Sequence, residues 1–385
     1  MSTLEANSII WQAEIAAGAG KADEALAGRV RRIVNAINTY GKMSEEQARA
    51  ATNQLRKILY HRLRMAGDRA RLPGIAAQEI KRPIFVVGMP RSGTSMLHSL
   101  LATNPGADAP VWWMSVDPSP PPGEVPVSQQ RLGYAALELD LFMLRAQPLF
   151  PLHPYWDARD QAIVENEELF TLDFQNAYAM KCYDVPTLSV DLNAPEKPVD
   201  AYKFLREFMQ HFQWNRPVTH WVTKGISHQY SLASLFEVFP DAIVLWPHRN
   251  PTDILPSTYA IMSVVFGTIN NWNTDPRKFA AADVESMRES FKVLMNDPAV
   301  HDPRVHHIDF RKLAADPIAT IRGIYEREGL GFGSEFKTGI EAWLANPANA
   351  SNRWGRYQYT YEQYGISVAE IDKGFAEYRR HFGIE

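Results

Sequence analysis

The chain of 385 residues contains a single cysteine, Cys182, which excludes an intrachain disulfide and any metal site built from several cysteines. Charge of one sign is not in excess either: the formal net charge is −4, so no global basic field points to nucleic acid. No apolar run approaches the ~18 residues of a membrane span. The first 20 residues lack a basic segment followed by an apolar core, so we expect no signal peptide. A soluble, cytoplasmic enzyme is the simplest class that these absences leave.

A lysine is also absent, from a segment that otherwise resembles a phosphate-binding loop. A P-loop reads G-x-x-x-x-G-K-[ST]. Here Gly88 and Gly93 have that spacing and Ser95 ends the pattern, but Thr94 stands at the lysine position and the loop carries Arg91 instead. Backbone N–H groups at such a helix start can hold an anion. The sequence therefore predicts phosphate binding without ordinary Mg–ATP chemistry, and no metal site.

The hydrophobic pattern around this loop predicts an α/β fold. Strand-like runs lie at 84–87, 218–223, 242–246 and 304–308, and helical patterns separate them. Such an alternation predicts a P-loop-type parallel sheet flanked by helices on both faces.

Two helical regions are expected outside this alternation. Residues 1–80 show helical spacing and form a helical N-terminal extension, which we expect to serve in packing or in a homo-oligomer. The α/β domain then covers 81–385, with a helical insertion at about 125–216.

A second anion-binding element follows the strand at 242–246. Arg249 stands just beyond that strand, and Asn250-Pro251 can start the next helix, which carries Ser257 two turns on. Ligands bind at the carboxyl edge of parallel sheets. An arginine at a strand end and a serine on the following helix can therefore converge on one phosphate.

The two elements together resemble the PAPS-dependent sulfotransferases, in the bacterial-type branch with Pro-Arg-Ser-Gly-Thr in the loop. The segments that carry the resemblance are Gly-Met-Pro-Arg-Ser-Gly-Thr-Ser at 88–95 and, about 155 residues later, His-Arg-Asn-Pro-Thr-Asp-Ile-Leu-Pro-Ser at 248–257. The resemblance implies that the first segment binds the 5′-phosphosulfate and the second the 3′-phosphate of PAPS, with PAP as product. The implied donor-binding residues are Arg91, Ser92, Gly93, Thr94, Ser95, Arg249 and Ser257.

Two further segments resemble family motifs. Lys224-Gly-Ile-Ser-His228 is similar to the family's Lys-x-Pro-x-His segment, with Ile226 in place of proline. The segment 355–365 is similar to the loop that closes over the 3′-phosphate, although Tyr357 stands where the family usually has histidine. The resemblance implies three closing residues, which are Arg353, Gly355 and Arg356.

The catalytic groups are expected to be cations and one base. Arg91 and Lys224 can stabilise the charge that develops during sulfuryl transfer. His228 is the first choice for the base that takes the acceptor proton, because imidazole titrates near neutral pH and follows this lysine in the family.

One departure affects the base. Related sequences often show Ala-Pro-x-x-Trp-Glu after the loop helix, whereas this chain has Met114 in place of that glutamate. Glu168 is therefore a candidate, with Glu165 and Glu167 as alternatives, although we expect at least two of these three on a solvated face. A His-Pro-Tyr-Trp-Asp segment at 153–157 also resembles a family motif.

The acceptor is expected to be a small, hydrophobic or aromatic molecule with a hydroxyl or amine group, because aromatic side chains gather near the loop and in the insertion. They are Trp112, Trp113, Tyr155, Trp156, Phe170 and Phe174. Two alternatives stay open: a P-loop kinase or NTPase, which would require Mg²⁺, and a non-catalytic nucleotide-binding protein.

Overall fold

A computed structural model describes residues 2–41, 43–145, 147–152, 158–176, 195–264, 275–350, 352–355 and 359–384. A five-stranded parallel sheet lies at its centre, in the order β2-β3-β1-β4-β5. The strands are β1 (Ile84–Val86), β2 (Ala107–Asp108), β3 (His220–Lys224), β4 (Ile243–His248) and β5 (Val305–Asp309). The predicted α/β class is confirmed. The sequence missed β2, because two residues carry no alternation.

Helices cover both faces of the sheet. Along β1, successive side chains point to opposite faces, so Ile84 and Val86 pack into one hydrophobic cluster and Phe85 into the other. The first cluster is closed by α4 (Thr94–Leu101), α13 (Phe310–Ala315), α14 (Pro317–Arg327) and α15 (Ser334–Ala345).

The opposite face is covered by helices from both sides of β3 in the sequence. They are α5 (Trp112–Val116), α6 (Gln129–Arg145), α7 (Asn166–Leu172), α9 (Pro198–Gln213), α10 (Leu232–Val238), α11 (Pro251–Val264), α12 (Pro276–Leu294), α16 (Val368–Gly374) and α17 (Ala376–Phe382). Three of them, α6, α7 and α9, fall in the insertion predicted at about 125–216.

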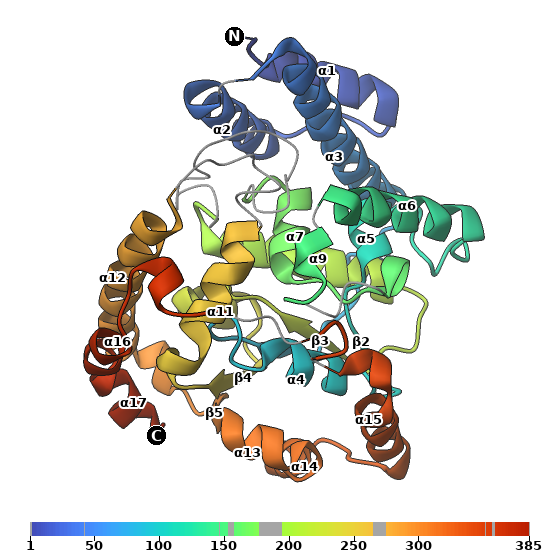
Figure 1. The fold of residues 1–385 in the computed structure, drawn as a ribbon. Helices are drawn as coiled ribbons and strands as arrows, with labels where there is room; N and C mark the ends of the chain where they lie inside the picture. The colour runs from blue at the N-terminus through green and yellow to red at the C-terminus, as the bar shows by residue number, and fades with distance from the viewer. Residues whose placement is uncertain are drawn as a thin grey trace.

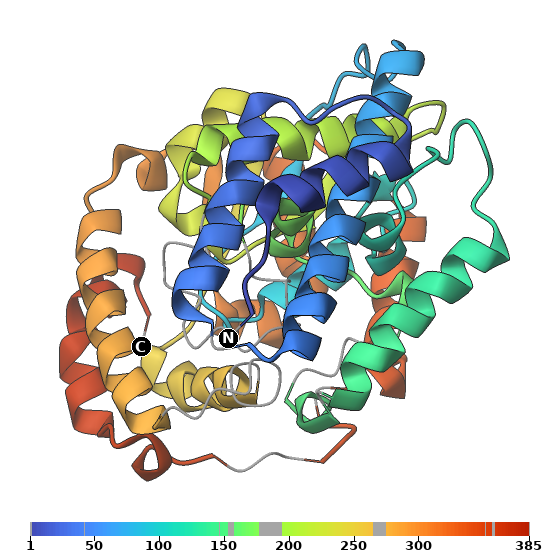
Figure 2. The same cartoon turned by 90° about the horizontal axis from the view of Figure 1, so that it is seen from above.

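Three N-terminal helices lie over this face of the sheet (Figure 1). They are α1 (Ala6–Ala17), α2 (Glu24–Tyr40) and α3 (Glu45–Arg71). Seen from above, they cross the centre of the molecule between α12 and α6 (Figure 2). Their buried side chains, Leu55 and Leu59 among them, belong to the same hydrophobic cluster as Phe85 of the sheet. The helical character of residues 1–80 is thus present, while a domain boundary at residue 80 and a homo-oligomer through these helices stay predictions.

Local sequence signals place the helix starts. Ser44 and Gln47 form a reciprocal capping box at the start of α3, with distances of 3.2 Å from the Gln47 amide to Ser44 Oγ and 2.7 Å back. Asn250 precedes α11, and its side chain accepts from the Thr252 amide at 3.1 Å. Since β4 ends at His248, two residues before this cap, Arg249 lies at the carboxyl edge of the sheet.

Candidate active site

The loop that the sequence predicts to bind phosphate connects β1 to α4, and its backbone has the shape that the glycine spacing predicts. Gly88, Arg91 and Gly93 have positive φ angles of 130°, 69° and 94°. A Cβ atom at Gly93 would lie 2.6 Å from the Phe310 ring, so no other residue fits there. Left-handed residues before a helix start turn successive N–H groups inward, which suits an anion.

Ser92 and Thr94 are buried within the loop. The Ser92 hydroxyl donates to the Met89 carbonyl at 2.7 Å, and the Ser92 amide donates to the same oxygen at 3.3 Å. Ser92 therefore stabilises the turn that carries Arg91.

The two anion-binding elements meet at Arg91. Its Nε donates to Ser257 Oγ at 2.7 Å, and its backbone carbonyl accepts from Arg249 Nη1 at 3.3 Å. The Arg249 guanidinium also lies 4.7 Å from the centre of the Phe310 ring. Segments about 160 residues apart thus form one continuous cradle, with two guanidinium groups beside the loop.

Lys224 brings a third cation to the start of α4. It ends β3, and its Nζ donates to Ser95 Oγ at 3.1 Å and to the Glu165 carboxylate. Only 5% of the Lys224 side chain is exposed, against 25% for Glu165. Because the Lys224 ammonium has three N–H donors, it can still bind one further oxygen.

His228 lies behind this arrangement, enclosed by protein. Its Nε2 accepts from Asn166 Nδ2 at 2.8 Å, and its Nδ1 donates to the Tyr202 hydroxyl at 2.8 Å. The Thr223 hydroxyl donates to Asn166 Oδ1 and so fixes the orientation of the amide. Burial lowers the pKa of His228 to about 3. Both ring nitrogens are therefore engaged, and the neutral form is stable at neutral pH.

The three glutamates at the start of α7 have different surroundings. Glu167 is buried, and its Oε1 accepts from the Ser227 amide at 2.9 Å and from the Ser227 hydroxyl at 2.8 Å. Burial and, after it, the Glu165 charge raise the pKa of Glu167 to about 7. Glu168 is also buried. The expected solvated acidic face is wrong for Glu167 and Glu168, because α7 is enclosed by the surrounding helices.

The raised pKa of Glu167 should make the free energy of unfolding depend on pH. A carboxyl whose pKa is raised in the folded state stabilises the fold below its unfolded pKa of about 4.5, and that contribution is lost as the pH rises through about 7. Glu167→Gln mimics the protonated form. From pH 5 to pH 8, the free energy of unfolding of the wild type should decrease by at most about 3 kcal/mol, and that of Glu167→Gln should decrease less. Thermal unfolding at the two pH values provides the measurement.

The matched control is Glu341→Gln, which changes a half-exposed glutamate on α15. This variant should keep the wild-type pH dependence. An identical pH dependence in Glu167→Gln and the wild type would contradict the raised pKa.

The C-terminal loop is described in part. Arg353 donates to the Ala348 carbonyl and stacks at 5.4 Å from the centre of the Trp354 ring. Gly355 has a φ of 88°. Arg356 and the 153–157 motif lie outside the described residues, so closure of this loop over the donor stays a prediction.

Three residues that bear on the site carry no sequence signal of their own: Asn166, Tyr202 and Thr223. They reach His228 or each other across 26 to 62 residues of chain. Within the described residues, the structure has no group of three or more His, Cys, Asp or Glu side chains that could hold a metal ion. The same part of the chain contains no helix long and apolar enough to cross a membrane.

A parallel α/β sheet with a glycine-containing loop and several cationic side chains at its carboxyl edge is an arrangement typical of proteins that bind phosphorylated ligands. Comparison with protein families narrows this class. The family model described as "Sulfotransferase family" matches residues 83–333, which is more than half of the chain. The chain belongs to the sulfotransferase family and is therefore a sulfuryl-transferring enzyme. This membership decides against the kinase and the non-catalytic alternatives.

Several mycobacterial sulfotransferases are similar to this chain in sequence or in fold. The omega-hydroxy-beta-dihydromenaquinone-9 sulfotransferase Stf3 of Mycobacterium tuberculosis and that of Mycobacterium bovis are each 22% identical to this chain, over 79% of it and 75% of their own length. Sulfotransferase STF9 from Mycobacterium avium superposes with a TM-score of 0.82 at 23% identity, covering 100% of this chain and 98% of its own. Sulfotransferase STF1 from M. tuberculosis has a TM-score of 0.75 at 20% identity, over 97% and 99%. At this identity, the two structures show the shared fold alone.

Proposed function

We propose that this enzyme transfers the sulfuryl group of PAPS to the hydroxyl group of a small hydrophobic acceptor, with PAP as the second product. The observation that carries the proposal is the junction at Arg91, where the loop contacts both Ser257 and Arg249. A donor with phosphate groups at both its 5′ and 3′ positions requires two adjoining anion sites, and the family's usual donor has both. The cytoplasmic location expected from the sequence stays a prediction.

The residues present fit this donor. The N–H groups of 91–95 and the N-terminus of α4 suit the 5′-phosphosulfate, because helix starts attract anions. Arg249 and Ser257 suit the 3′-phosphate, and the Phe310 ring under the Arg249 guanidinium restricts its orientation. PAPS, when bound, supplies the sulfuryl group and a stable leaving phosphate.

The cations balance the charge that moves during the reaction. The S–O bond to the leaving phosphate breaks, and a new S–O bond to the acceptor oxygen forms. Arg91 and the α4 N-terminus stabilise the negative charge on the leaving oxygen. Lys224, held by Ser95 and Glu165, offers its third N–H to a sulfuryl oxygen.

We propose Glu165, in place of His228 or Glu168, as the base that takes the acceptor proton. Glu165 combines partial exposure with contact to Lys224, whereas His228 and Glu168 are buried. The position also compensates for Met114. The Trp112 amide donates to the Ala162 carbonyl at 2.8 Å. This bond holds the segment that contains Met114 beside the segment that precedes Glu165. Glu165 thus brings a carboxylate to this region from a neighbouring segment.

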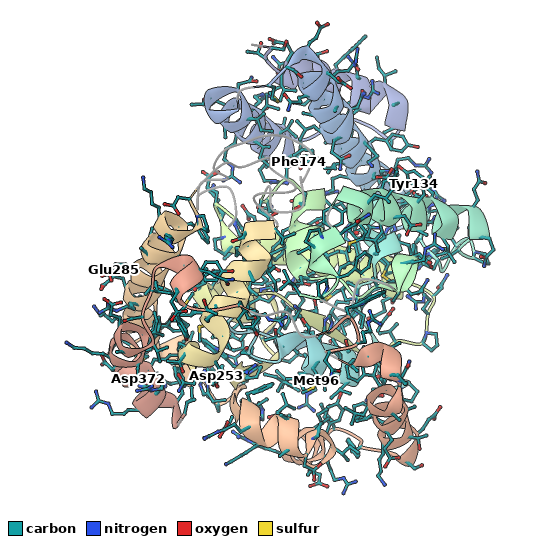
Figure 3. The ribbon with its side chains drawn as sticks, in the orientation of Figure 1. Met96, Tyr134, Phe174, Asp253, Glu285 and Asp372 are labelled. Carbon is teal, nitrogen blue, oxygen red and sulfur yellow. The ribbon has the colours of Figure 1, made fainter. Side chains whose placement is uncertain are left out.

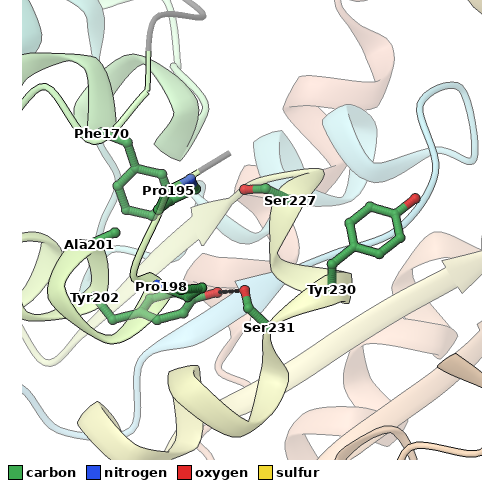
Figure 4. Close-up of a pocket in the computed structure, with 8 residues that line it drawn as sticks. All are labelled: Phe170, Pro195, Pro198, Ala201, Tyr202, Ser227, Tyr230 and Ser231. Carbon is green, nitrogen blue, oxygen red and sulfur yellow. Dashed lines mark hydrogen bonds between the residues drawn. The ribbon is translucent and has the colours of Figure 1, made fainter. Parts of the chain in front are cut away.

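A pocket beside the site supports a hydrophobic acceptor. It has a volume of about 130 Å³ and lies between α7, α9 and the turn after β3 (Figure 4). Apolar side chains line one side, Phe170 and Ala201 among them, and the hydroxyl groups of Ser227 and Ser231 line the other. The Ser227 hydroxyl also donates to Glu167, which lies two residues after the proposed base Glu165. The two Stf3 relatives are named for omega-hydroxy-beta-dihydromenaquinone-9, and this name also favours an apolar acceptor with a hydroxyl group.

Three of the four described aromatic residues expected around the acceptor pack instead against other parts of the protein. Trp113 packs edge-on against Phe212 with 5.5 Å between the ring centres, and Phe174 is buried. Trp112 donates through Nε1 to the Ala135 carbonyl at 2.8 Å. Phe170 alone of the described members of that set lines the pocket. Tyr155 and Trp156 lie outside the described residues.

Filling the pocket should weaken acceptor binding selectively. Ala201→Leu is expected to raise the KM of an apolar acceptor about tenfold, because the added side chain occupies the space that the acceptor requires. The dissociation constant for PAP, measured by calorimetry, should not change. Ala280→Leu, at an equally buried alanine on α12, controls for overpacking. Equal KM values for the wild type and Ala201→Leu would contradict the assignment of this pocket.

Turnover tests the proposed reaction. The protein is incubated in EDTA with PAPS and a panel of acceptors that includes phenols, steroid alcohols and prenyl alcohols with a terminal hydroxyl, and PAP and the sulfated product are detected by mass spectrometry. We expect PAP and sulfate ester in equal amounts with at least one apolar alcohol. PAP release that never yields a sulfated acceptor, or transfer only to charged sugars, would contradict the proposal.

A further inference from the structure

The helix that carries the proposed base is held at both of its ends. At its start, Glu165 pairs with Lys224, Asn166 with His228 and Glu167 with Ser227, all near the end of β3. These contacts fix the start of α7 relative to the donor loop. The residue that ends α7 is Asp173, and only 2% of its side chain is exposed.

Two arginines from the N-terminal helices bind Asp173. Arg29 of α2 donates through Nη2 to Asp173 Oδ2 at 2.7 Å and through Nε to the Asp173 carbonyl at 2.8 Å. Arg62 of α3 donates through Nε to Asp173 Oδ1 at 2.6 Å. The carboxylate thus has a guanidinium on each oxygen. Arg29 also caps the carbonyl end of α7, where a positive charge is favourable.

The surroundings of this cluster keep its charges balanced and its position fixed. Arg62 reaches Glu207 of α9 at 3.5 Å and lies 5.0 Å from the centre of the Phe204 ring. Burial lowers the pKa of Arg62, but the Asp173 carboxylate outweighs this effect, and the net shift is upward. Arg32 adds a bond to the Gln175 carbonyl at 2.9 Å. Phe174, the neighbour of Asp173, lies directly beneath the N-terminal helices (Figure 3).

We propose that Asp173, held by Arg29 and Arg62, is a positioning residue for sulfuryl transfer that fixes α7 and thereby keeps Glu165 on Lys224. The N-terminal helices would then serve catalysis by bracing the base-carrying helix. A helix of seven residues has little stability of its own, so its position depends on tertiary contacts at its two ends. This inference rests on the proposed function, since it assigns Asp173 an effect on the reaction through Glu165.

The test compares kcat, donor affinity and double variants. Asp173→Asn keeps the shape but removes the charge, and should lower kcat roughly 10- to 100-fold with the affinity for PAP unchanged. In a Glu165→Gln background, Asp173→Asn should lower kcat no further, because the base is already lost. Arg29→Lys keeps the charge but loses the two-point contact. Arg29→Lys should therefore lower kcat less than Asp173→Asn does, again with the affinity for PAP unchanged. If Asp173→Asn does not fold, Arg29→Lys provides the test.

The matched control is Asp302→Asn, which breaks another aspartate–arginine contact, the one to Arg304 at 2.7 Å, at the turn before β5. Its kcat should equal that of the wild type. A wild-type kcat in Asp173→Asn, or a loss that multiplies with that of Glu165→Gln, would overturn the inference.

Amide hydrogen exchange separates this inference from the proposed function. If the wild type transfers no sulfuryl group from PAPS, the proposed function fails. The brace is then judged by exchange at residues 166–172. Faster exchange there in Asp173→Asn than in Asp302→Asn supports the brace, and equal exchange overturns it.

Discussion

Lys224→Met is expected to lower kcat for sulfuryl transfer roughly 10²- to 10³-fold, because it removes a preorganised cation from the transferring group. Lys224 is almost fully buried, with its ammonium fixed between Ser95 and Glu165, so it stabilises developing charge without reorganising. Methionine has a similar length and no charge. Steady-state kinetics with PAPS and a fixed acceptor give kcat, and calorimetry with PAP gives the donor affinity.

The kinetic pattern distinguishes this role from simple donor binding. A cation that acts mainly in the transition state changes kcat more than the dissociation constant for PAP, which lacks the sulfuryl group. Lys337→Met, at a half-exposed lysine paired with Glu341, should leave kcat unchanged. If Lys224→Met weakened PAP binding and preserved kcat at saturation, Lys224 would be a donor-binding residue only.

Glu165→Gln is expected to lower kcat roughly 10²- to 10⁴-fold, since an amide cannot take the proton of the acceptor hydroxyl. The loss should be largest for alcohols, whose protons are weakly acidic, and smaller for acidic phenols. The pH dependence of kcat should also change, because the limb that reports the base in the wild type disappears. Kinetics with one alcohol and one nitrophenol across pH 5–9 provide the measurement.

Two variants control the assignment of the base. Glu168→Gln alters a buried carboxylate on the same helix and should reduce kcat far less than Glu165→Gln. His228→Gln removes the imidazole that Asn166 and Tyr202 bind, so it should lower the melting temperature more than it lowers kcat. A near-complete loss of kcat in His228→Gln, together with normal turnover in Glu165→Gln, would restore His228 as the base.

The conformation of the loop at 88–93 and four of the five strands could be predicted because their signals are local. Gly88 and Gly93 both have a positive φ angle, which favours glycine. Both positions lie within six consecutive residues, so the pattern can be recognised in the sequence alone. Two of the four predicted strands, 84–87 and 242–246, are runs of buried apolar residues, and all four lie within two residues of their positions in the structure. The positions of Arg249 and Ser257 could be predicted for the same reason, since a strand end and the following helix fix where the two residues lie relative to each other.

The surroundings of the base candidates could not be predicted in the same way, because they depend on contacts between distant segments. Ser227, Gln229 and Tyr230 surround His228 in the sequence with polar groups, which favours exposure. The structure instead encloses His228 between Phe85 and Phe170, at ring distances of 5.4 and 6.0 Å. Burial of this kind arises only when α7 and β1 meet, and no periodicity near residue 228 reports that contact.

The burial of the glutamates at the start of α7 could not be predicted for the same reason. Consecutive acidic residues usually mark a solvated helix face. Here Ser227 donates to Glu167 and Lys224 donates to Glu165, across about 60 residues of chain. The signal that could have indicated burial is Leu169-Phe170 directly after them, an apolar pair that continues the same short helix.

Calorimetric titration with 3′,5′-ADP and with ATP, both in EDTA, tests the proposed donor site. We expect metal-independent binding of 3′,5′-ADP, much weaker binding of ATP, and loss of that preference in Arg249→Ala, because Arg249, which contacts the loop at Arg91, is proposed to bind the 3′-phosphate. The same ligand should raise the melting temperature of the wild type. Tighter binding of ATP, dependent on Mg²⁺ and unaffected by Arg249→Ala, would contradict the proposed PAPS site.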